Sequence, residues 1–198
     1  MLKTLQNKKS NLPDYLWKVS FFKGEFMEYF DLFDINGIKL NKKMARGTKN
    51  LKGEYHKVVH IWIRNSFGDY LVQQRNKAAD RNPYQWAPTA GAVTSGEEAI
   101  VSAIRETYEE IGLLLKESEL QHIDSLYVDN DDANYLVEIY LVHKDVSLDD
   151  LVLDRVEVKD VAFYSKEKIL KMIDAQEFWN FLIYLPTYDY FGVLEKSL

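Results

Sequence analysis

Apolar and polar residues alternate along much of the first half of the chain, a period of two that is typical of half-buried β-strands. Residues 27–47 are expected to form a hairpin, because strand-like segments flank the turn sequence from Asp34 to Gly37. Residues 53–65 and 70–75 predict a second hairpin. In its first strand, the alternation places four residues on one face: His56, Val58, His60 and Trp62.

From Glu97 the apolar residues recur at intervals of three and four, which predicts an amphipathic helix. Its buried stripe is expected to consist of Ile100, Ala103, Ile104, Thr107 and Ile111. Ser95 is the expected N-cap, and Glu97 and Glu98 then lie where the helix dipole stabilises negative charge. Gly112 is expected to end the helix.

Three further strands are expected downstream, at residues 119–128, 135–142 and 156–163. A helix is expected from Lys166 to Ile173. The apolar and aromatic residues between Phe178 and Phe191 favour a last helix, which is expected to belong to the core or to contact a second copy of the chain in a homodimer rather than to line a ligand pocket. Strands that bracket one long helix are typical of α+β or α/β architecture.

Composition narrows the classes of partner. With 198 residues, the chain has room for one domain with a substantial core. Its net charge of −6 argues against a nucleic acid as the main partner. It has no cysteine, which excludes disulfides, thiolate metal sites and a cysteine nucleophile. No apolar run approaches membrane length and no secretory signal is recognisable, so we expect a cytoplasmic location and no membrane partner.

Residues 1–26 differ from the rest, because they are basic at first and then rich in aromatic side chains. One interpretation is a strand or short helix that docks its aromatic face. The other is that the native protein begins at Met27, since the codons for residues 23–26 can form a purine-rich ribosome-binding sequence. We therefore divide the chain into an N-terminal extension, residues 1–26, and a domain, residues 27–198.

Three carboxylates of the predicted helix share one face, because Glu106, Glu109 and Glu110 are three and four residues apart. Like charges at these spacings each cost a few tenths of a kcal/mol, roughly, and a bound divalent cation reverses the sign of that effect. Oxygen ligands without cysteine or histidine suit Mg²⁺ or Mn²⁺ rather than Zn²⁺. The alternative from these three residues alone is a solvated acidic face.

The full pattern from Gly91 to Leu113 resembles the Nudix box of the Nudix hydrolase superfamily. The matching positions are Gly91, Glu97, Arg105, Glu106, Glu109, Glu110 and Gly112, with Leu113 as the closing aliphatic residue. Thr107 departs from the pattern, which usually has an aliphatic residue there. The resemblance extends from about residue 27 to about residue 173 and is greatest to a subgroup related to isopentenyl-diphosphate isomerase.

This resemblance implies a mixed β-sheet between helices, an α/β/α sandwich of the α+β class, with the box as loop, helix and loop. It also implies a Mg²⁺- or Mn²⁺-dependent pyrophosphohydrolase that cleaves a small molecule of the type nucleoside diphosphate linked to another group. The implied metal ligands are Glu106, Glu109, Glu110 and the backbone carbonyl of Gly91. Glu97 and Arg105 are expected to order the box through a salt bridge. The alternative is a catalytically idle module that binds a nucleotide as a sensor.

An isomerase is disfavoured, because residues 87–93 contain neither the cysteine nor the histidine that the isomerase requires. His56 and His60 are then expected to be strand residues with local hydrogen bonds. Glu157, and less so Glu138, are candidates for the general base, and the alternative for each is an ordinary structural or solvated carboxylate. Three basic residues are candidates for phosphate contacts: Arg75, Lys77 and Arg81.

Overall fold

The computed structural model describes residues 27–76, 82–130, 133–180 and 188–196. The expectations for residues 1–26, for Lys77 and for Arg81 lie outside these ranges, and so does the division of the chain at residue 26. No helix in the described ranges is long and apolar enough to cross a membrane.

Nine strands of the described chain form a mixed sheet around a long central strand, β3. The strands are β1 (Tyr29–Phe33), β2 (Lys39–Ala45), β3 (Tyr55–Arg64), β4 (Tyr70–Arg75), β5 (Trp86–Ala87), β6 (Thr89–Ala92), β7 (Gln121–Asn130), β8 (Ala133–His143) and β9 (Val158–Tyr164). The β3–β8 pair is parallel, whereas the other pairs between these strands are antiparallel. Both expected hairpins and the expected mixed sheet are therefore present.

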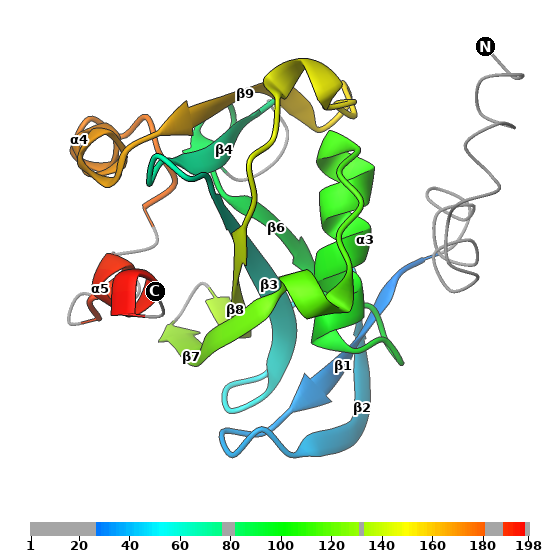
Figure 1. Cartoon of the computed structure of the whole chain (residues 1–198). Coiled ribbons are helices and arrows are strands. Elements are labelled where there is room, and N and C mark those ends of the chain that lie inside the picture. Colours follow the sequence, from blue (N-terminus) through cyan, green and yellow to red (C-terminus); the bar gives the residue numbers. More distant parts are fainter. Residues whose placement is uncertain (1–26, 77–81, 131–132, 181–187, 197–198) are drawn as a thin grey trace, which may run out of the picture.

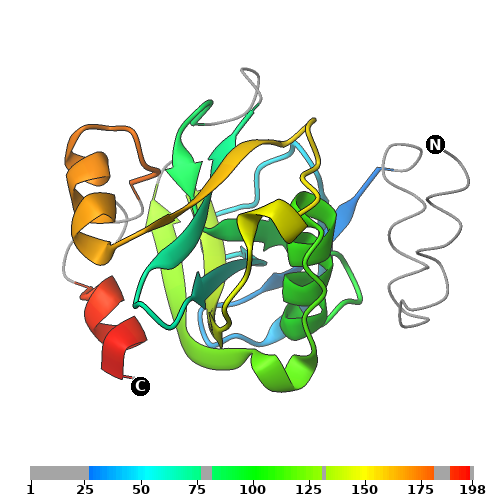
Figure 2. The ribbon, with the colours of Figure 1, turned by 45° about the horizontal axis from the view of Figure 1, so that its top comes forward.

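Helices cover both faces of this sheet (Figures 1 and 2). Helix α3 (Ala99–Ile111) packs on one face, where its Ile104 and Ile111 join Val59 and Ile61 of β3 in one buried cluster. Helices α4 (Lys166–Asp174) and α5 (Tyr190–Lys196) lie on the other face and pack in a second buried cluster that includes Trp62. The alternation along β3 sends successive side chains to these two clusters, and the sandwich expected from the sequence is confirmed.

The sequence prediction placed the start of α3 too early. The N-cap is Glu98, without a side-chain capping hydrogen bond, and the described first turn contains no acid. Ser95 does not cap the helix, because its hydroxyl donates instead to Oδ1 of Asp31 on β1, 2.9 Å away. Gly112 does end the helix, with a φ of 71° that few other residues adopt readily.

The expected last helix does not begin at Phe178. This residue is extended and forms an isolated bridge with Trp86 of β5, and α5 begins only at Tyr190. Residues 181–187 lie outside the described ranges. Strand β9 begins at Val158, two residues later than expected, so Glu157 lies in the turn before it.

Candidate active site

Gly91 of β6 lies directly against Glu106 of α3. A Cβ atom added to Gly91 would lie 2.2 Å from Cδ of Glu106, closer than any real contact between these atoms. Glu106 is 7% exposed, and its side chain occupies the space that any larger residue at position 91 would fill. Glycine is required here because the helix carboxylate packs on the backbone of the strand.

Glu110 is buried one helical turn further along α3 and accepts a hydrogen bond of 2.7 Å from Nε2 of Gln73 on β4. Burial raises its pKa to about 8, and the negative charges of Glu106 and Glu157 add to this rise. The Gln73 hydrogen bond and the positive charge of Arg75 act in the opposite direction. These interactions place Glu106, Glu110, Glu157 and Arg75 in one electrostatic site.

Strand pairing explains how Glu157 and Arg75 reach α3. Strands β4 and β9 are antiparallel neighbours, and the N–H of Asn76 donates to the carbonyl of Glu157 over 2.8 Å. Glu157 is 47 residues from Glu110 in the sequence, so only the folded sheet brings the two together. The predicted general-base candidate and the predicted phosphate contact thus share the site with the carboxylates of the helix.

Arg105 connects the loop to the helix. Arg105 is 4% exposed, and its Nη2 lies 2.9 Å from Oε2 of Glu97, which is the expected salt bridge. Its Nη1 lies 2.6 Å from Glu106 and 3.4 Å from Glu109. Although burial opposes its charge, the carboxylates of Glu106 and Glu97 raise the pKa of Arg105. Glu97 also accepts from the hydroxyl of Thr94, 2.7 Å away.

The expected metal ligands do not converge on one point. Glu106 and Glu109 turn toward Arg105, Glu110 turns toward Gln73, and no group of three or more Asp, Glu or His side chains in the described ranges has the arrangement of a metal site. The donor set nevertheless fits a hard divalent cation. It contains only oxygen ligands, and a buried carboxylate with two carboxylates nearby carries repulsion that such a cation relieves.

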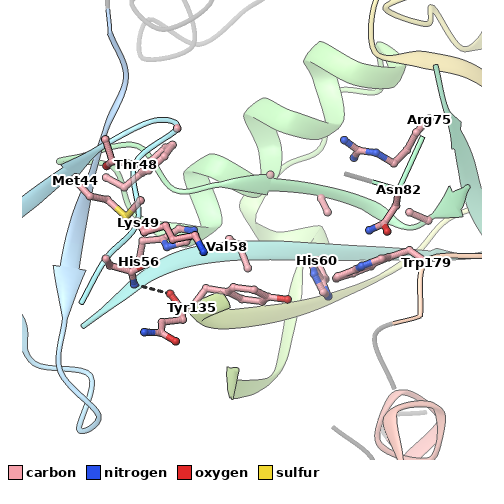
Figure 3. A pocket seen from close by; sticks show the side chains of 17 residues that line it. Met44, Thr48, Lys49, His56, Val58, His60, Arg75, Asn82, Tyr135 and Trp179 are labelled. Atoms are coloured by element: carbon pink, nitrogen blue, oxygen red, sulfur yellow. Dashed lines mark hydrogen bonds between the residues drawn. The ribbon is translucent and has the colours of Figure 1, made fainter. Parts of the chain in front are cut away.

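A pocket of about 630 Å³ extends along β3, and Arg75 and Gly91 are among the residues that line it (Figure 3). His56, Val58 and His60 line its floor, on the face of β3 opposite α3. Trp179 lies near one end of the pocket and Lys49 near the other. The only charged residues among the described lining are Lys49 and Arg75, so the lining favours an anionic ligand.

The two histidines are strand residues, as expected, but their environments differ. Nδ1 of His60 lies 2.8 Å from the hydroxyl of Tyr190, a residue of α5. Nδ1 of His56 is buried without a hydrogen-bond partner in the described part of the chain. Burial lowers the pKa of His56 to about 4 and that of His60 to about 3, so both rings are neutral at pH 7.

Several site residues carry no signal in the sequence. Gln73 is one polar residue in a short strand, and only the fold brings its amide to Glu110. Trp179 and Tyr190 belong to the segment from Phe178 to Phe191, in which apolar and aromatic residues are so frequent that neither residue is distinguished. Glu138, the weaker base candidate, lies in a different network, where it accepts hydrogen bonds from Lys57, His122 and Ser125.

Comparison with protein families matches residues 54–184 to the NUDIX domain. An uncharacterized Nudix hydrolase of Listeria innocua is 35% identical over 77% of this chain and 88% of its own length. The isopentenyl-diphosphate Δ-isomerase of Streptomyces coelicolor is 29% identical over 70% of this chain and 72% of its own length.

A solved structure shares the same fold. The crystal structure of DR0079 from Deinococcus radiodurans superposes with a TM-score of 0.66 and covers 80% of this chain and 96% of that protein, at 20% identity. At this identity the likeness concerns the fold alone.

Proposed function

The chain belongs to the Nudix hydrolase family, and from that premise we propose that it is a pyrophosphohydrolase that uses Mg²⁺ or Mn²⁺. Its substrate is a small molecule in which a diphosphate joins a nucleoside to another group. The observation that carries the proposal is the cluster of Glu106, Glu110 and Glu157 with Arg75. Arg75 and Gly91, which packs against Glu106, also line a pocket whose described charged residues are basic.

The residues that would hold the metal are Glu106, Glu109, Glu110 and the carbonyl of Gly91. A divalent cation held there would neutralise the charge of the diphosphate and lower the pKa of a water molecule, the expected nucleophile. Gln73 fixes the carboxylate of Glu110 through its amide. Arg105 fixes Glu97 and Glu106 and so keeps the loop and the helix in register.

Two further side chains have roles at the diphosphate. Arg75 acts on Glu110 through its charge and also lines the pocket, so a phosphate held between the two regions is within its reach. Glu157 is the residue we assign as general base for the attacking water, because its carboxylate is close enough to Glu110 for its negative charge to raise the pKa of Glu110.

Hydrolysis rather than isomerisation is the proposed reaction, although the comparisons include isopentenyl-diphosphate isomerases. The isomerase requires a cysteine, and the chain has none. Incubation with isopentenyl diphosphate, followed by analysis for dimethylallyl diphosphate, checks this point. Formation of the isomer would contradict the proposal.

The main test is phosphate release from a panel of diphosphate compounds with Mg²⁺ or Mn²⁺. The panel contains nucleoside triphosphates, nucleotide sugars, ADP-ribose, dinucleoside polyphosphates and thiamine diphosphate. We expect one compound to be hydrolysed and Glu110→Gln to lower its turnover by at least about 100-fold, since the carboxylate is an expected metal ligand. Glu117→Gln changes an exposed carboxylate outside the cluster and should leave turnover unaltered.

A nucleotide sensor is the second candidate. The observation in its favour is that Arg105 bonds to both Glu106 and Glu109, so two of the expected metal ligands are turned toward a cation of the chain itself. A sensor would hydrolyse no compound of the panel, while one of these compounds would still raise the melting temperature of the wild-type chain.

A further inference from the structure

His60 connects the pocket with the buried core beneath it. Its side chain lines the pocket and lies edge-to-face with Trp179, with ring centroids 5.0 Å apart (Figure 3). On its other side, Nδ1 lies 2.8 Å from the hydroxyl oxygen of Tyr190 on α5. A polar group with 3% exposure in such a position is a candidate for recognising a ligand.

The Tyr190 hydroxyl has two partners that bear on the protonation of His60. Nε1 of Trp62 lies 3.2 Å from this hydroxyl, and an indole N–H can only donate, so the hydroxyl oxygen accepts from Trp62. Nδ1 of His60 lies 2.8 Å from the same hydroxyl. When the phenol donates its proton to Nδ1, the neutral ring carries its own proton on Nε2.

The rest of the pocket indicates which chemistry this donor meets. Tyr135 and Trp179 provide flat apolar surface, and the described lining contains no carboxylate that would attract a cationic group. Arg75 provides positive charge at the end of the pocket where Asn82 and Trp179 lie. A ligand that suits this lining has an anionic end and a flat, uncharged organic group that carries hydrogen-bond acceptors.

We infer that His60 is a specificity-determining residue, whose Nε2–H donates a hydrogen bond to an acceptor atom on the flat organic group of the substrate. The inference rests on the proposed function for the diphosphate part of that substrate. Trp62 and Tyr190 are positioning residues, because they fix the tautomer and the ring orientation through Nδ1.

The tautomer is measured first, on the full chain labelled with ¹⁵N-histidine, by long-range ¹H–¹⁵N NMR. We expect His60 to give the pattern of a neutral ring protonated on Nε2, and Tyr190→Phe to convert it to a mixture of tautomers. Tyr70→Phe is the matched control, because Tyr70 is equally buried in the same cluster and its hydroxyl has no partner among the described residues. A ring protonated on Nδ1 in the wild-type chain overturns the inference.

Kinetics with the panel compound that is hydrolysed form the second measurement. We expect His60→Leu to raise KM about fivefold, the factor for one neutral hydrogen bond, with kcat within about twofold of the wild type. His60→Gln, whose amide can replace the Nε2–H donor, should recover most of the loss. Equal KM values for the Gln and Leu variants, or a fall in kcat alone, overturn the inference. Circular dichroism verifies that each variant is folded.

A binding experiment distinguishes a failure of this inference from a failure of the proposed function. The panel compounds are added with Mg²⁺ to the Glu110→Gln chain, and the Nε2 resonance of His60 is followed. If no compound is hydrolysed by the wild-type chain but one moves this resonance, the proposed function fails and the role of His60 stands. If a compound is hydrolysed and the resonance does not move when it binds, the role of His60 fails and the proposed function stands.

Discussion

At the scale of single residues, the site depends on the close approach of Gly91 to Glu106. Gly91→Ala places a methyl group where the carboxylate now lies, so the side chain of Glu106 must leave its position. We expect a loss of turnover of about 100-fold and an increase in the Mg²⁺ concentration required for half-maximal activity.

The double variant Gly91→Ala, Glu106→Ala isolates this contact. Removing the carboxylate relieves the overlap, so urea unfolding should show the double variant to be more stable than the sum of the two single effects predicts. Strictly additive free energies would show that the two residues do not meet in solution.

Arg105 is a second single residue on which the site depends. Arg105→Met leaves the buried carboxylates of Glu97 and Glu106 without their cation, and we expect a loss of about 3–5 kcal/mol in the free energy of unfolding. Arg105→Lys keeps the positive charge but not the planar guanidinium, and should lower the free energy of unfolding by less than Arg105→Met does. The comparison is made by urea denaturation, and equal stability of Arg105→Met and wild type would contradict it.

Residues with fixed local roles were predictable from the sequence, whereas residues with distant partners were not. The spacing of Glu97 and Arg105 sufficed to expect their ion pair, because both belong to one loop and helix. Ser95 was wrongly expected to cap α3, because its actual partner, Asp31, lies on β1 and 64 residues away. Gln73 and Tyr190 have no local pattern that distinguishes them from ordinary strand and core residues.

At the scale of elements, the end of α3 depends on Gly112. Its φ of 71° is strained for other residues, and an added Cβ would lie 2.9 Å from the carbonyl oxygen of Val152. Gly112→Ala should therefore lower the free energy of unfolding by about 2 kcal/mol or more. Gly96→Ala is the matched control, because Gly96 also has a positive φ but open space around it.

The difference in the free energy of unfolding between Gly112→Ala and Gly96→Ala measures the effect of the contact with Val152. A thermal or urea unfolding experiment on both is sufficient. If Gly112→Ala and Gly96→Ala lose the same stability, the contact with Val152 contributes nothing.

Strands and helices were predicted correctly where a single hydrophobic period continues along the whole element. The alternation in β3 predicted the strand and the residues that share each face, and the helical period in α3 predicted the helix and its buried stripe. The last helix was misplaced because Phe178 and its neighbours are apolar at many consecutive positions, which suits a core strand as well as a helix. Phe178 pairs with Trp86 of β5, and this pairing, which is formed only in the folded chain, determines that the residue is extended rather than helical.

At the scale of the whole molecule, the two buried histidines make stability depend on pH. Their pKa values are lowered to about 4 and about 3, so the unfolded chain binds protons below pH 6.5 that the folded chain does not. Stability is therefore lost as the pH falls from about 6.5 toward these values. Glu110 acts in the opposite direction, since its pKa is raised to about 8.

A variant of His60 separates its contribution to the pH dependence of stability from that of Glu110. His60→Leu should remove up to about 1.4 kcal/mol of pH dependence per pH unit below pH 6, while the contribution of Glu110 remains the same in both chains. His143→Gln changes an exposed histidine and serves as the control. Urea unfolding between pH 7 and pH 5 checks the prediction, and parallel curves for His60→Leu and wild type would exclude it.

The contact between His60 and Tyr190 also determines when the molecule can finish folding. The two residues are 130 positions apart, which corresponds to roughly 7 to 26 seconds of synthesis at about 5–20 residues per second. Until α5 leaves the ribosome, the face of β3 that bears Trp62 lacks part of its cover, and exposed apolar surface of this kind promotes aggregation. A nascent chain halted before Tyr190 should therefore bind chaperones, and it should release them once α5 has been synthesised.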